Sequence, residues 1–364
     1  MRSGTSGTCA SDLFENLIMK LGTLFALIAV MLFSSMTRQV AVVERKERLS
    51  DYGFFEGKLA DLIPAQGIVS YEVNTPLFSN YAEKIRFVQF PEGVSAKYSD
   101  SSFFDLPVGT ILIKNFMYPS DFRDHSKGRT ILETRLLVHQ EKGWEAWPYI
   151  WNDAQTEALY DPAGESRTIS YLDGKGKKKS TLYAIPNKNQ CKGCHANAGK
   201  MVPIGITARQ LNREVSIGGK KINQLSSWTE RSFLSGFRSP QHSPRLAVWD
   251  DPAFGTLTER ARAYLDANCG HCHSSNGPAN TSGLHLDVFE SRLVHLGVNK
   301  TPVAAGRGAG NLKFDIVPGN PDESILVFRM KTTDPAVAMP EIGREQIHSE
   351  GAALIEEWIR AGKF

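Results

Sequence analysis

The pentapeptide Cys-Lys-Gly-Cys-His at 191–195 returns as Cys-Gly-His-Cys-His at 269–273. Each copy reads Cys-x-x-Cys-His, the attachment site of a c-type haem. Two thiols three positions apart lie on one side of a helical turn, where they can bond the two vinyl groups of one porphyrin. The following His then points its imidazole at the iron. The sequence therefore predicts two covalent c-type haems, held by Cys191, Cys194, Cys269 and Cys272, with His195 and His273 as proximal iron ligands.

Two other readings of the cysteine pairs are possible. Two Cys-x-x-Cys half-sites can close around one structural zinc, but the spacing is usually shorter and zinc does not require a His after both pairs. A thioredoxin-like redox pair would need a βαβ unit around it, and neither pair has one. Of the five cysteines, only Cys9 lies outside the two motifs. It precedes the apolar segment described next, so the mature chain is expected to have neither a free thiol nor a structural disulfide.

Residues 21–35 are almost wholly apolar, with Lys20 before them and Ser34 and Ser35 at their end. A basic start, an apolar core and a small-residue exit are typical of a signal peptide. A membrane-spanning helix needs about 20 apolar residues, which is more than this run offers. Segment 1–36 is therefore predicted to be an N-terminal extension and cleaved signal, with an uncleaved anchor as the alternative. The predicted location is the periplasm, or the inner membrane facing the periplasm.

Composition sets broad limits on the class of protein. A length of 364 residues suggests two or three domains, and 41% hydrophobic residues are ordinary for a globular protein. A net charge of +3 with no dense basic face argues against a nucleic-acid partner. A membrane partner is expected only if the N-terminal segment stays uncleaved.

Residues 51–185 are predicted to form a β-rich domain. Apolar and polar residues alternate at 69–73, 85–90 and 134–139, and turn signals separate these runs. Short strands at such spacing favour an antiparallel sandwich or barrel. Segment 186–250 is predicted to be the first haem-binding segment, with a helix around 223–235.

Residues 255–364 are predicted to form a cytochrome c domain. Thr258 can cap a helix that delivers the second motif, and further helices are expected near 324–330 and 345–361. The predicted fold class is thus α+β multidomain, with an antiparallel β-rich N-terminal domain followed by an all-α cytochrome c-like C-terminal domain.

The sixth iron position decides whether a haem only carries electrons or also binds a small molecule. A Met thioether fills it in many cytochromes c. For the second haem the predicted ligand is Met339, which precedes Pro340 in a loop between two predicted helices. Its rival, Met330, ends an apolar helical turn and is better explained as a core residue.

The distal ligand of the first haem stays open. Met201 is so close to His195 that an extended chain could barely travel round the porphyrin edge. An open sixth site is also possible. The β-rich domain is expected to supply part of the first pocket, because little chain separates the two motifs. Other candidates are Met117, His125, His139 and His242, while His271, His285, His295 and His348 are expected to be surface residues.

The chain resembles the uncharacterised di-haem c-type cytochromes of Gram-negative bacteria, which have a β-rich N-terminal region and a C-terminal cytochrome c domain. The resemblance implies two covalent haems, a periplasmic or secreted location and electron transfer. It covers roughly 55–362 and rests on the segments 74–79, 107–110, 133–137, 149–152, 186–195, 261–265, 302–308 and 339–341.

Three functions remain in competition. The first is an exported electron carrier whose redox partners are a dehydrogenase, a quinol system or a soluble cytochrome, with no catalysis of its own. The second is a di-haem peroxidase-like enzyme with an open first haem, which needs a distal acid–base residue. The third is a sensor whose β-rich domain binds a ligand through Trp144, Trp147 and Trp151.

Overall fold

The computed structural model describes residues 42–341 and 343–364, and residues 42–364 form one compact unit. Segment 1–36, with Cys9 and the apolar run 21–35, lies outside the described residues, so the signal peptide stays a prediction. None of the helices in the described part of the chain has the length and apolar character that crossing a bilayer requires.

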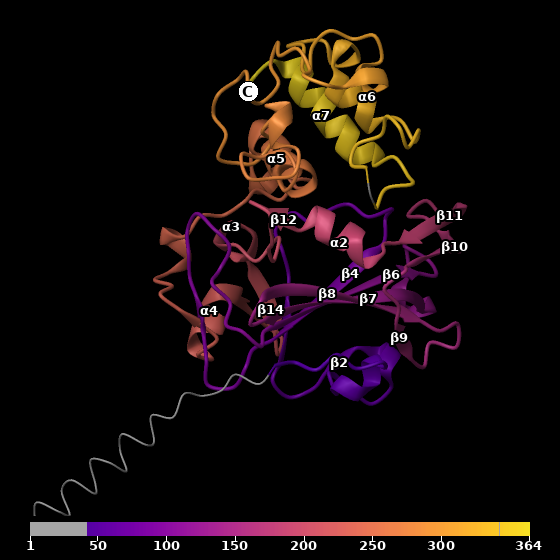
Figure 1. Ribbon diagram of the computed structural model, residues 1–364, viewed down its shortest axis with the longest axis vertical. Helices are drawn as coiled ribbons and strands as arrows, with labels where there is room; N and C mark the ends of the chain where they lie inside the picture. Colours follow the sequence, from indigo (N-terminus) through magenta and orange to yellow (C-terminus); the bar gives the residue numbers. More distant parts are fainter. Residues whose placement is uncertain (1–41, 342) are drawn as a thin grey trace, which may run out of the picture. The chain divides into compact units, whose positions relative to one another are not determined.

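A six-stranded antiparallel sheet organises the first half of the unit (Figure 1). Adjacent strands of the sheet follow one another in the sequence, except that β5 is not part of it, so the sheet is an antiparallel meander. In spatial order the strands are β3 (Ile68–Tyr71), β4 (Glu83–Gln89), β6 (Ile111–Pro119), β7 (Arg129–Gln140), β8 (Gly143–Trp151) and β9 (Ala158–Tyr160).

Both faces of this sheet are covered, because successive side chains of a strand point to opposite faces. One face packs under N-terminal residues such as Leu49, Phe54 and Leu62. The other face packs against helices that follow the sheet, among them α2 (Lys188–Cys194), α3 (Ala208–Leu211) and α4 (Gln224–Glu230). Coverage on both sides explains why β6 is apolar at nearly every position rather than at every second one.

Smaller two-stranded pairings surround the sheet. The hairpin of β10 (Glu165–Leu172) and β11 (Lys178–Ile185) covers the end of the sheet near α2. The other pairs are β1 (Phe55–Glu56) with β2 (Ile63–Pro64), β12 (Ala196–Asn197) with β13 (Lys200–Met201), β14 (Glu214–Ile217) with β15 (Lys220–Asn223), and β5 (Ala96–Lys97) in parallel with β16 (Leu234–Ser235).

The predicted sandwich or barrel is wrong. The strands expected at 69–73, 85–90 and 134–139 correspond to β3, β4 and β7, but in the described chain they form one open sheet whose second layer is partly helical. Alternation along a strand shows that a face is buried without showing whether a helix or a second sheet buries it.

The C-terminal region does not form the predicted all-α cytochrome c-like domain, so the predicted fold class is wrong. The structure is 24% helical and 28% strand, and no such domain is evident in the residues that it describes. The α-helices there are short: α5 (Leu257–Leu265), α6 (Ile325–Met330) and α7 (Ser349–Ala361). Between α5 and α6 the glycine- and proline-rich chain is mostly irregular, because those residues disfavour a continued helix.

Candidate functional site

The first cysteine motif lies on α2, a two-turn helix that begins in a capping box. The side chain of Asn187 accepts from the backbone N–H of Gln190, and the Gln190 side chain accepts from the backbone N–H of Asn187, both at 2.9 Å. The helix ends at Cys194, and His195 is its C-cap. α2 packs on β8 (Figure 1), so both thiols are delivered to the covered face of the sheet.

His195 is held in one orientation by the hairpin that follows it. Its Nδ1 lies 2.7 Å from the carbonyl oxygen of Val202, and the backbone N–H of Val202 donates to the carbonyl of His195 at 2.9 Å. Burial lowers the pKa of His195 to about 4. The ring is therefore neutral near pH 7, and a hydrogen bond at Nδ1 leaves the Nε2 lone pair for a metal.

The second motif follows α5. That helix begins in a capping box made by Thr256 and Glu259, two residues earlier than the predicted cap, Thr258. A π-helical turn, Asp266–Gly270, carries Cys269, and the backbone N–H of His273 donates to the carbonyl of Cys269 at 2.8 Å. Burial lowers the pKa of His273 to about 4, so this imidazole is also neutral near pH 7.

Both motifs line one cavity of about 1150 Å³. Pockets for small ligands are ordinarily about 300–1,000 Å³, so this one exceeds the usual size. The chain segments that follow the two motifs touch, since the backbone N–H of Ala198 donates to the carbonyl of Asn276 at 2.8 Å. The lining contains all six predicted attachment residues, namely Cys191, Cys194, His195, Cys269, Cys272 and His273.

Met339 and Met330 both line this cavity, but their surroundings differ. Met330 is 5% exposed and belongs to the core that α5, α6 and α7 share. Met339 is only partly buried and lies in the loop after α6, where its backbone N–H donates to the carbonyl of Arg329 at 3.1 Å. Of the two methionines, Met330 is thus a core residue and Met339 is not.

The remaining distal-ligand candidates from the sequence are not part of the cavity lining. Met201 packs against the core next to α2, and Met117 is buried on the opposite face of the sheet. His139 stacks on Trp144, and the other two histidines are exposed. The described residues that line the cavity do not include Met117, His125, His139, Met201 or His242.

Two histidines that were expected at the surface lie in the cavity instead. His348 stacks on Phe78 with ring centroids 4.1 Å apart, and its Nδ1 lies 3.0 Å from the hydroxyl of Tyr264. His271 has a buried Nδ1 with no hydrogen-bond partner. Burial lowers the pKa of each to about 4, so both imidazoles are neutral near pH 7.

A row of basic side chains crosses the sheet where it faces the cavity. Arg86 on β4 pairs in register with Lys114 on β6, which pairs with Arg135 on β7, and all three line the cavity. Arg135 is paired with the buried carboxylate of Glu133, whereas no ion pair is found for Arg86 or Lys114 among the described residues. Burial and the neighbouring cations hold the pKa of Lys114 well below its usual range. Cationic side chains with no acidic partner on a cavity wall fit an anionic ligand group.

The Glu133–Arg135 pair gives a prediction about stability. Glu133 is fully buried and accepts from Arg135 Nε at 2.6 Å and from the Tyr183 hydroxyl at 2.7 Å. Glu133→Gln should destabilise the protein by about 3 kcal/mol, since it leaves Arg135 without a counter-charge. Chemical denaturation measures this loss. Glu165→Gln is a matched control, because Glu165 pairs with Arg167 on a more exposed strand. Equal losses in the two variants would contradict the prediction.

The thiols do not form the alternative zinc site. Among residues 42–341 and 343–364, the one group of three or more His, Cys, Asp or Glu side chains close enough to share a metal ion contains no cysteine. The four described cysteines are not in disulfides. Burial raises the pKa of Cys269 to about 12 and of Cys272 to about 11, so these thiols stay protonated near pH 7. The described thiols are therefore not gathered at one point as the ligands of a tetrathiolate zinc site are.

The tryptophans of the β-rich region do not form a ligand-binding surface. Trp147 and Trp151 are buried on the face of the sheet opposite the cavity, and Trp144 stacks on His139. Their positions are those of packing residues.

No family model matches the chain, and neither the curated proteins nor the solved structures contain a match.

Proposed function

We propose that the protein is an exported di-haem c-type cytochrome that carries electrons between periplasmic redox partners. One observation carries the proposal: both Cys-x-x-Cys-His motifs and Met339, which lie far apart in the sequence, line a single large cavity. A relay needs its two redox centres close together, and a shared cavity meets that need. The resemblance to the di-haem cytochromes of Gram-negative bacteria implies the same role.

The residues of the cavity fit two haems in complementary ways. The four cysteines would hold the porphyrins, and the neutral rings of His195 and His273 would bind the two irons. Met339 would fill the sixth position of the second haem. Arg86, Lys114 and Arg135 would bind the propionate carboxylates of the first haem, since all three line the cavity together with Cys191 and Cys194. Haem iron supplies reversible one-electron oxidation when it is bound.

The location and the partners follow from the same proposal. Bacterial c-type haem is attached outside the cytoplasmic membrane, and segment 21–35 has the pattern of an export signal. The expected partners are a dehydrogenase or quinol system that donates electrons and an oxidase or soluble cytochrome that accepts them.

Haem counting tests the proposal directly. Protein produced with a c-type haem attachment system should keep its colour after acid–acetone extraction, and the pyridine haemochrome should give two haems per polypeptide. Replacing Cys191 and Cys194 together by Ala should lower the count to one, and so should replacing Cys269 and Cys272. A wild-type count of zero or one contradicts the proposal.

A peroxidase-like enzyme is the second candidate. The buried, unpartnered Nδ1 of His271 is the observation that favours it, because peroxide chemistry needs a base beside an open iron. Electron paramagnetic resonance separates the two functions. Two six-coordinate low-spin haems indicate the carrier, and a high-spin haem indicates the enzyme.

A further inference from the structure

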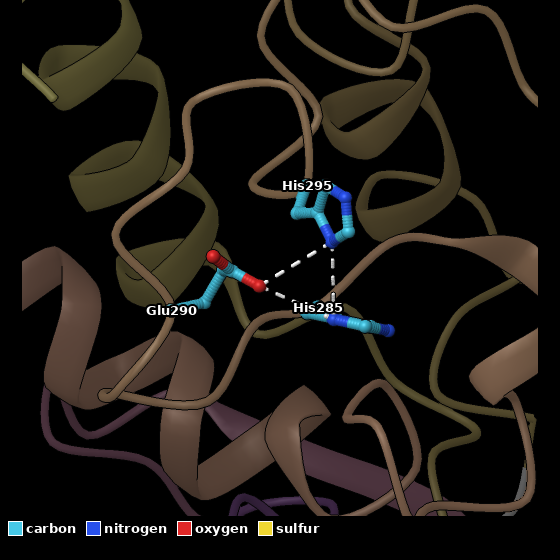
Figure 2. A group of neighbouring side chains, drawn as sticks. All are labelled: His285, Glu290 and His295. Carbon is cyan, nitrogen blue, oxygen red and sulfur yellow. Dashed lines mark hydrogen bonds and ion pairs between the residues drawn. The ribbon is translucent and has the colours of Figure 1, made fainter.

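Three polar side chains from the irregular chain between α5 and α6, those of His285, Glu290 and His295, converge on one another (Figure 2). His285 Nδ1 lies 3.2 Å from Glu290 Oε2, and His295 Nδ1 lies 3.4 Å from the same oxygen. The two Nδ1 atoms are 3.4 Å apart. The backbone holds the two histidines together, since the N–H of His285 donates to the carbonyl of His295 at 2.7 Å.

Ordinary hydrogen bonding does not account for this triangle. A carboxylate offers about four lone-pair positions. Arg292 already donates to three of them, from its backbone N–H and Nε to Oε1 at 2.8 and 2.9 Å and from Nη2 to Oε2 at 2.7 Å. One position remains for two imidazoles.

The alternative tautomers do not relieve the conflict. If His295 donates to Nδ1 of His285, the lone pair of His285 is engaged and its ring has no proton to offer Glu290. If both rings donate to Oε2, that oxygen receives three donors, counting Arg292. In each arrangement, either two lone pairs face each other without a proton between them or one carboxylate oxygen receives three donors.

A metal ion resolves the conflict, because all three lone pairs can then point at one cation. Ligand atoms about 2.0–2.1 Å from a tetrahedral Zn²⁺ lie about 3.3–3.4 Å from one another. The three observed separations agree with one triangular face of such a tetrahedron. Imidazole nitrogen and carboxylate oxygen are both ordinary zinc ligands.

We propose that His285 Nδ1, Glu290 Oε2 and His295 Nδ1 bind a divalent transition-metal ion of the zinc class. The side chains of His285 and Glu290 are 12% and 6% exposed, whereas that of His295 is 31% exposed. The ion is thus bound at a wall of the protein with its fourth position toward solvent on the His295 side. Arg292 orients the carboxylate from outside, as residues around metal ligands commonly do.

This site is separate from the proposed haem function. None of its three ligands is among the described residues that line the cavity. Its loop nevertheless contacts the second motif, since the backbone N–H of Leu286 donates to the carbonyl of His273 at 2.7 Å. An ion bound here would brace the irregular chain next to that motif.

Zinc titration of the full chain tests the proposal. The protein is first stripped with a chelator and treated with iodoacetamide, so that any free thiol is blocked whether or not haem is attached. Calorimetry with ZnCl₂ should then give one site per chain. Glu290→Gln and His285→Ala should each weaken binding at least about 100-fold, while His242→Ala, a change at an exposed histidine, should leave it unaltered.

Circular dichroism checks that each variant is folded like the wild type. A variant whose spectrum is altered is replaced by His295→Ala, so that a loss of zinc binding is not caused by unfolding. Zinc-edge X-ray absorption of the wild type should show nitrogen and oxygen neighbours, including imidazole, and no sulfur near 2.3 Å. The proposal is overturned if the wild type binds no zinc, if folded variants bind it as the wild type does, or if sulfur is found.

Discussion

We expect Met339→Ala to open the proposed second haem to carbon monoxide and cyanide and to lower its midpoint potential. The thioether sulfur stabilises ferrous iron, and its loss leaves water or no ligand in the sixth position. Axial ligands set haem potentials over a range of about 0.8 V, so the loss of one should shift the potential far more than a change outside the iron ligands. Redox titration and the weak sulfur-to-iron absorption band in the far red measure it.

Met330→Ala is the matched control, because both methionines line the cavity. Met330 is almost fully buried in the core with Leu326 and Trp358, so its truncation should cost about 2–5 kcal/mol of stability. It should leave the absorption band and the potential in place. If Met330→Ala abolishes the band and Met339→Ala preserves it, the two roles are reversed.

The features predicted correctly from the sequence are those that depend on residues close together in the chain. The two motifs, the helices at 223–235, 324–330 and 345–361, and several strands follow from spacing and periodicity, and they correspond to α4, α6, α7 and strands of the sheet. The caps were displaced by a few residues, as at Thr256 and Thr258, because several polar residues near a helix start can serve. The proposed attachment residues could be named from sequence because those of each motif lie within five positions of one another.

Features that depend on long-range pairing could not be found in this way. The open sheet replaced a predicted sandwich, because the periodicity of a strand does not identify the layer that covers it. The cationic row depends on the registers β4–β6 and β6–β7. His348 looks like a surface residue in a loop until Phe78 and Tyr264 enclose it.

The proposed metal site could be predicted from the sequence only in part. His285, Glu290 and His295 lie within eleven positions, so their residue types were visible in the sequence. They recur every five positions, a spacing that matches neither the helical nor the strand period, and the chain between them is irregular. Backbone hydrogen bonds of the folded loop, such as that from the His285 N–H to the His295 carbonyl, bring the rings together.

Lys114→Met should lower the midpoint potential of the first haem, and Lys179→Met should not. Lys114 lies in the middle of the row of basic side chains and lines the cavity together with Cys194, whereas Lys179 is an exposed residue of β11 outside the cavity lining. Removing a nearby cation favours the ferric state, which carries one more positive charge. Coulomb's law at an effective dielectric constant of about 20 makes the shift on the order of tens of millivolts. Redox titration of the two variants measures it.

In the chain without haem, the same substitution should raise the free energy of unfolding. There Lys114 has no anionic partner, and its pKa is held well below the usual value by burial. Between that lowered pKa and the usual value of about 10.4, the unfolded chain binds more protons than the folded one, so stability falls as pH falls through this window. Lys114→Met should therefore stabilise the haem-free protein near pH 7, measured by urea unfolding, while Lys179→Met changes little. Destabilisation by Lys114→Met would show that the lysine is a packing residue, and equal potentials in the two haem-loaded variants would show that the row does not bind the propionates.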